Sequence, residues 1–151
     1  MSPFATTTTL NVVLGIIFLL AAIFFLVTGG MATAGKLPGN TVIGLRVPEV
    51  RKNESTWVQA HRVVGPFWVL TGLAMAIGAA FAFIAHGWVW IAPVIALVAA
   101  VIALSVGGNF GARAALLVDA AQNSTTAEPA PSPAVDLDAL RNAASKADGE
   151  A

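Results

Sequence analysis

The sequence is poor in charge and contains no cysteine. Only 11% of its 151 residues are charged, against about 25% in a typical soluble domain, and the mean hydropathy is +0.79. This composition excludes an ordinary soluble domain and indicates a protein of the lipid bilayer. The formal net charge is zero, so the chain lacks the global basic field that attracts nucleic acid. The absence of cysteine excludes disulfides, thiolate chemistry and cysteine-based metal sites.

Three long stretches carry no charged side chain: Leu10 to Gly29, Pro66 to Ala85 and Trp88 to Val106. A helix needs about 20 apolar residues to cross a hydrocarbon core of about 30 Å, so each stretch predicts a transmembrane helix. A secretory signal peptide is the alternative for the first stretch, because Ala32-Thr33-Ala34 resembles a cleavage site. The first nine residues have no Lys or Arg and the apolar run exceeds the usual length of about 7 to 15 residues, which favours a retained helix.

The expected fold class is therefore all-α: a polytopic membrane protein with three transmembrane helices and an ordered cytoplasmic connector that contains a short interfacial helix. We expect a short external N-terminus at 1–9, transmembrane helices at 10–30, 66–85 and 88–118, a connector at 31–65, an external turn at 86–87, and a tail at 119–151.

The cations predict the orientation of these helices. Those before the third helix all lie in the connector: Lys36, Arg46, Arg51, Lys52 and Arg62. Loops rich in Lys and Arg face the cytoplasm, so we expect a cytoplasmic connector and tail, with the N-terminus and the His86-Gly87 turn outside. Trp88 and Trp90 beside that turn are typical of an interfacial aromatic belt.

Small residues at four-residue spacing predict where the helices pack. The third helix carries Ala99, Ala103, Gly107, Gly111 and Ala115, and the second carries Gly72, Ala76 and Ala80. Such stripes allow close backbone approach. Spacing alone leaves open whether the contact lies within one chain or between copies in an oligomer.

The tail is different in composition. After Gln122 it is rich in Pro, Ala and Ser, with almost no large apolar residue, and predicts disorder. Asp136 to Lys146 could form a brief helix, capped by Asp136.

The connector gathers most of the polar residues of the first 110. Gly35, Pro38 and Gly39 end the first helix, and an apolar extended run follows as far as Pro48. Asn53 then predicts an N-cap for a helix that bears, on one face, Glu54, Trp57, His61 and Gly65. Pro66 fits either the first turn of a new helix or a kink in a continuous one.

The connector resembles the hallmark loop of the SdpI family of bacterial integral membrane proteins, in a three-helix form. The residues that carry the resemblance, in order, are Leu37, Pro38, Asn40, Gly44, Arg46, Pro48, Asn53, Glu54, Trp57, Ala60, His61, Arg62 and Gly65. The resemblance extends from residue 10 to about residue 115 when the helical layout is included. It implies a multi-pass protein of the bacterial plasma membrane that gives immunity against a secreted peptide toxin, and that holds a transcriptional repressor at the membrane when toxin is bound.

Three other interpretations of the connector stay open at this point. Its cations could bind anionic lipid, at about 1 kcal/mol for each Lys or Arg, in an envelope-maintenance role. The residues could be architectural, with Asn40 capping a turn and Arg46 pairing with Glu54 or bonding carbonyls left open at the broken helix end. In this interpretation Trp57 and His61 hold the short helix at the interface. The chain could also be a small accessory subunit of a larger membrane complex.

Catalysis and transport are not favoured. His61 and Glu54 could form an acid/base pair, but we find no metal-ligand or triad spacing, and we expect no cofactor. The three apolar spans contain no ionisable residue to serve as a relay.

Overall fold

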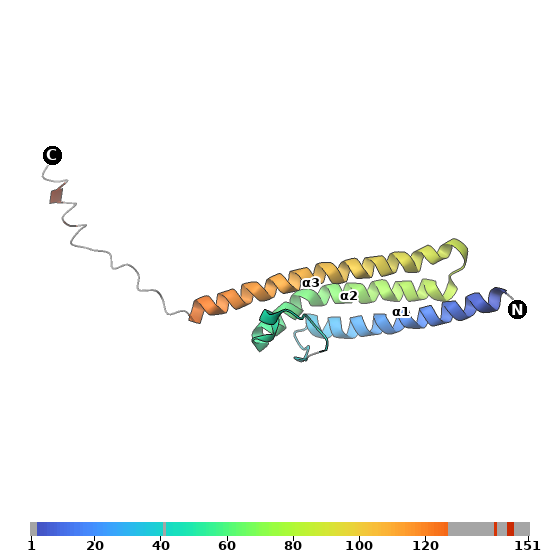
Figure 1. Ribbon diagram of the computed structural model, residues 1–151, viewed down its shortest axis with the longest axis horizontal. Coiled ribbons are helices and arrows are strands. Elements are labelled where there is room, and N and C mark those ends of the chain that lie inside the picture. The colour runs from blue at the N-terminus through green and yellow to red at the C-terminus, as the bar shows by residue number, and fades with distance from the viewer. Residues whose placement is uncertain (1–2, 41, 127–140, 142–144, 147–151) are drawn as a thin grey trace. The chain divides into compact units, whose positions relative to one another are not determined.

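The computed structural model describes residues 3–40, 42–126, 141 and 145–146. The described residues form helices and loops, with no strand among them (Figure 1). The elements are α1 (Pro3–Thr33), the 3-10 helix η1 (Pro48–Arg51), α2 (Glu54–Ile84), the 3-10 helix η2 (Gly87–Trp90) and α3 (Ile91–Thr126). Residue contacts divide the chain into two units, Met1–Ala120 and Ala121–Ala151. The bundle and the connector described below belong to the first unit.

The three predicted membrane spans are confirmed as helices. Those long and apolar enough to cross a membrane cover Thr9–Thr33, Glu54–Ile84 and Gly87–Thr125. Many of their large apolar side chains point away from the bundle; Leu20 is 62% exposed and Ile84 is 65% exposed. Such surfaces would be costly in water and are at no disadvantage in lipid. The chain is therefore a multi-pass membrane protein.

The second helix begins earlier than expected. Residues 54–65 are helical, but they join the span without a break, so the short interfacial helix is the first part of α2. Pro66 lies inside this helix and its side chain is exposed. Proline removes the hydrogen bond to the carbonyl four residues earlier and its ring crowds that carbonyl, and α2 nevertheless continues through this position.

The third helix ends later than expected. It continues past residue 118 to Thr126, and Ala120, Ala121 and Gln122 in this extension favour helix. The predicted disorder of the tail is therefore wrong for residues 119–126. The remainder of the tail, with most of the short helix expected at 136–146, lies outside the described residues.

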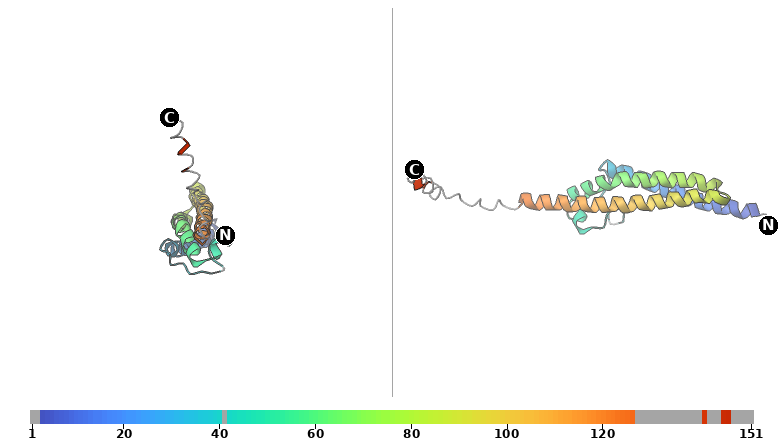
Figure 2. Two further views of the ribbon diagram at one scale, coloured as in Figure 1. Left: turned by 90° about the vertical axis from the view of Figure 1, so that its left-hand side faces the viewer. Right: turned by 90° about the horizontal axis from the view of Figure 1, so that it is seen from above.

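Helix α2 lies beside α1 (Figures 1 and 2), and the two helices pack through glycines. A Cβ atom added at Gly65 would lie 2.5 Å from the backbone nitrogen of Thr33, and one at Gly72 would lie 2.9 Å from that of Leu26. On the facing helix, a Cβ at Gly29 would lie 2.7 Å from the nitrogen of Val69. The two backbones therefore touch where only glycine leaves room, as small-residue packing in membranes requires.

Helix α3 uses its small residues against α2 and the connector. A Cβ added at Gly107 would lie 2.5 Å from Cβ of Phe67, and one at Gly111 would lie 2.6 Å from Leu45. The predicted stripe thus makes a contact within one chain. Ala103 and Ala115 are buried and Ala76 is half-buried, whereas Ala80 and Ala99 are exposed and take no part.

Candidate functional site

His61 joins the connector to α2. The residue is 1% exposed; its ring lies against Trp57 with centroids 4.0 Å apart and the two planes tilted by 31°, and it meets Trp68 edge-on at 5.9 Å. The Leu45 amide donates a hydrogen bond to Nε2 of His61 at 3.1 Å, and Nδ1 lies 2.8 Å from the Trp57 carbonyl oxygen. A neutral ring with its proton on Nδ1 satisfies both contacts, because Nε2 must then accept. His61 therefore holds two segments of backbone together through its ring nitrogens.

Gly44 allows the connector to approach these rings. Its φ angle is +121°, a conformation that L side chains rarely adopt. A Cβ atom there would lie 2.5 Å from Nε2 of His61 and 2.8 Å from Cη2 of Trp57. Both the backbone conformation and the lack of space therefore require glycine at this position.

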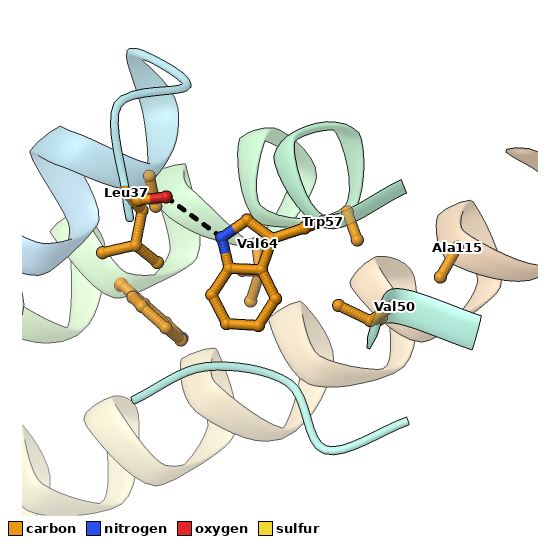
Figure 3. Packing of buried hydrophobic residues seen from close by; sticks show 8 residues of the cluster. Leu37, Val50, Trp57, Val64 and Ala115 are labelled. Carbon is orange, nitrogen blue, oxygen red and sulfur yellow. Dashed lines mark hydrogen bonds between the residues drawn. The ribbon is translucent and has the colours of Figure 1, made fainter. Parts of the chain in front are cut away.

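Trp57 anchors the other end of the connector. Its indole Nε1 donates a hydrogen bond to the Leu37 carbonyl oxygen at 3.0 Å, and both residues are 6% exposed (Figure 3). Figure 3 shows the indole at the centre of a cluster that joins all three long helices to the connector. The buried members of this cluster are Ala32, Leu37, Val50, Trp57, Ala60, Val64, Trp68 and Ala115.

Asn40 shapes the turn between these two anchors. Its Oδ1 accepts hydrogen bonds from the amides of Val42 (3.0 Å) and Ile43, and its Nδ2 donates to the Pro38 carbonyl oxygen at 3.0 Å. The side chain thus replaces the backbone partners that an irregular loop lacks. This matches the architectural interpretation of Asn40.

The connector begins at a tightly capped helix end. The Lys36 amide donates to the Met31 carbonyl and the Gly35 amide to the Ala32 carbonyl, with Gly35 at φ +69°. This is a Schellman motif, which satisfies carbonyls at a helix C-terminus and turns the chain away. The Arg62 guanidinium lies against Gly35, so α2 supports the turn from the side.

A cleft of about 630 Å³ opens between this turn and the start of α2. Leu37, Val50 and Trp57 give it apolar walls, and the side chains of Lys36, Arg51 and Glu54, all exposed, also line it. Pro38, Gly39, Asn40 and Asn53 complete the loop side of its lining. A concave site of this size with a few polar groups is of the kind that holds small ligands.

Comparison with known protein families supports the resemblance of this connector to the SdpI family. The family model described as the SdpI/YfhL protein family matches residues 36–107, which include the connector from Lys36 onward, all of α2 and the first part of α3. This match supports membership of the chain in the SdpI/YfhL family. No curated protein and no solved structure matches the chain.

The SdpI-like residues thus divide into buried and exposed groups. Gly65, Trp57 and His61 are buried, and Gly44 and Asn40 are half-buried, whereas the exposed group is Pro38, Arg46, Pro48, Asn53, Glu54 and Arg62. The expected pair between Arg46 and Glu54 is not formed over the described residues. Asn53 occupies the N-cap, as expected, but its side chain makes no capping hydrogen bond, and its carbonyl accepts from Trp57 instead.

An ion pair ties the connector to α3. Lys52 Nζ lies 2.8 Å from Oδ2 of Asp119, and this hydrogen bond raises the pKa of the Lys52 amine. Nothing in the local sequence links two residues so far apart, so sequence reasoning missed it. Trp68 was also missed, although it follows Trp57, His61 and Val64 at spacings of four, three and four residues, which is the period of one helix face.

The described residues contain no group of three His, Cys, Asp or Glu side chains that could hold a metal ion. Because both ring nitrogens of His61 are engaged with backbone groups, the ring has no free nitrogen with which to act on Glu54 or on a substrate in this arrangement.

Proposed function

We propose that this chain is an SdpI-like membrane protein of the bacterial plasma membrane that gives immunity against a peptide toxin, transmits a signal, or does both. It acts through a connector that faces the cytoplasm. Family membership supports the general class. The cations of the connector support its cytoplasmic side, since loops rich in Lys and Arg are retained there.

One observation carries the proposal: the connector holds exposed groups on a fixed backbone. Val42 is 77% exposed, and Arg46 and Pro48 are exposed beside it. The segment beneath them is held by the Asn40 turn and by the bond from Leu45 to His61. A loop that is ordered before binding loses less conformational entropy when a partner docks, which suits the capture of a soluble regulator such as a repressor.

The test is deletion and complementation. Deletion of the gene should sensitise cells to a secreted peptide toxin, and the wild-type chain should restore resistance. Arg46→Ala should fail to restore it while the protein inserts at normal levels, because the exposed guanidinium supports no internal contact over the described residues. Arg113→Ala removes an exposed cation from α3 and serves as the matched control. Full resistance with Arg46→Ala would contradict the assignment of this surface.

A second candidate function rests on a groove in the membrane part of the bundle. A depression of about 330 Å³ lies between α2 and α3 and is lined by apolar residues such as Ala74, Ile77, Ala96 and Ala99. Small residues at an open groove favour close approach of another transmembrane helix, as in an accessory subunit of a larger complex. Purification in mild detergent should then recover a stoichiometric membrane partner, and Ala99→Leu should release it.

A further inference from the structure

The cleft of the connector lies at the depth of the membrane surface. The apolar span of α1 ends at Thr33, and the turn that lines the cleft begins two residues later, at Gly35. The opposite wall is the first turn of α2, in the polar part of that helix that precedes the uncharged run from Pro66. Residues that directly follow a transmembrane span lie among the lipid headgroups.

The lining of the cleft is amphiphilic. Its buried walls are Leu37, Val50 and Trp57, none more than 6% exposed, while the cations Lys36 and Arg51 are exposed. The Lys36 amine forms no hydrogen bond or ion pair over the described residues. Glu54 supplies one carboxylate, so the charges that line the cleft are two positive and one negative. A ligand that matches this surface has an anionic head next to an apolar stem.

We propose that the cleft binds the headgroup of an anionic phospholipid, with Lys36 and Arg51 at the phosphate and the first acyl carbons against Leu37 and Trp57. Charge complementarity favours an anionic headgroup, and the depth of the cleft gives it direct access to membrane lipid. This inference goes beyond the proposed function and does not depend on it. Bound lipid would hold the turn at 35–40 against α2 at the membrane surface.

The alternative is a diffuse attraction between anionic lipid and all the connector cations. Arg46 and Arg113 distinguish the two cases, because both are exposed and neither lines the cleft. Gly39 offers a second distinction: it lines the cleft, and a Cβ atom there would meet nothing within 4 Å. Gly39→Trp can therefore place a large side chain at the cleft with all cations in place.

The experiment titrates the purified full-length chain, in an uncharged detergent, with dihexanoyl phosphatidylglycerol and follows heat release. Each cation near a membrane surface is worth about fivefold in affinity, so Lys36→Gln with Arg51→Gln should weaken binding about 25-fold. Gly39→Trp should also weaken it strongly. Arg46→Gln with Arg113→Gln should change it less than about twofold, since in this proposal neither cation touches the lipid.

Four results would overturn the proposal. Equal losses from the two cation pairs would assign the effect to diffuse attraction. Unchanged binding by Gly39→Trp, in protein with wild-type helicity and thermal stability, would exclude the cleft. Inorganic phosphate that binds as tightly as the lipid would indicate a site for free anions. Binding of an acidic peptide without binding of the lipid would indicate that the cleft binds a protein partner.

Discussion

The membrane spans and the connector satisfy their polar groups in different ways. In the spans, most hydroxyl groups bond within their own helix: Thr28 donates to the Phe24 carbonyl and Ser105 to the Val101 carbonyl, each four residues back. Two polar side chains depart from this pattern, since Asn11 donates to the Ala85 carbonyl and Thr71 also reaches the Ala100 carbonyl of α3. In the connector, hydrogen bonds join residues that are far apart in the sequence: Leu45 and His61 are separated by 16 residues, and Trp57 and Leu37 by 20. A span therefore depends on its general composition, whereas the connector depends on particular side chains.

This contrast teaches where substitutions should matter. The largest fully buried side chains include His61, Val50 and Val64, all at the connector end of the bundle. Elsewhere along the spans, large apolar residues face outward and can be exchanged for other apolar residues at little cost.

The largest expected effect is that of Trp57→Ala. It removes a buried indole and the hydrogen bond to Leu37, and such truncations cost about 3 to 5 kcal/mol. The chain should still insert, because the apolar spans are unchanged, but hydrogen exchange at amides 42–47 should lose its protection. Trp88→Ala is the control, since Trp88 is 81% exposed. Equal effects of the two variants would erase the contrast between connector and spans.

Gly44→Ala should come next. It strains a backbone at φ +121° and places a methyl group against His61 and Trp57, for a cost of about 3 kcal/mol in local opening. Gly39→Ala is the matched control, because a Cβ atom at Gly39 meets nothing within 4 Å. Amide exchange at Leu45 should increase only in Gly44→Ala. If Gly39→Ala raises it as much, the effect is general to loop glycines and the fit at Gly44 is not the cause.

The spans could be predicted from the sequence because one property decides them. In lipid, a run of about 20 uncharged residues forms a helix, because its backbone groups must bond within the segment. The three helices therefore follow from composition alone. Their ends are set by weaker local terms. Pro66 was expected either to begin a helix or to kink one, and the structure has it inside α2 with its ring exposed. The local sequence is compatible with both outcomes, so the sequence alone could not choose between them.

The candidate site was predictable in its residues and not in its contacts. The spacing of Trp57, His61 and Gly65 correctly placed them on one helix. The Asn40 turn was predictable because asparagine side chains commonly bond nearby backbone groups in loops. The partners Leu37 and Leu45 act through backbone groups, which have no signature in sequence. The predicted ion pair between Arg46 and Glu54 is not formed over the described residues, because two exposed charges gain little free energy from pairing.

Asn40→Ala should have a smaller effect than Gly44→Ala. It leaves the Val42 and Ile43 amides without their partner, but this turn is partly exposed and water can replace one bond, so the cost is about 1 kcal/mol. Asn40→Asp keeps the accepting oxygen and should retain most of the protection at amide 43. An aspartate variant as exposed to exchange as the alanine variant would show that the bond to Pro38 matters more than the accepted pair.

The smallest expected effect is that of the ion pair between the connector and α3. Lys52 is half-exposed, so solvent screens its attraction to Asp119 and the pair should add only slightly to the protection of the connector. Because pairing raises the pKa of Lys52 above 10.5, its contribution is fully present at neutral pH and is lost only as the pH rises beyond that value. Lys52→Glu should loosen η1 slightly, by placing two carboxylates together, and the exchanged pair Lys52→Glu with Asp119→Lys should restore it. High salt should remove the difference between the single and exchanged variants, since exposed pairs are screened. If the exchanged pair protects amides 48–52 no better than the single variant, the contact between connector and α3 rests on apolar packing around Val50 and Ala115, and charge has no part in it.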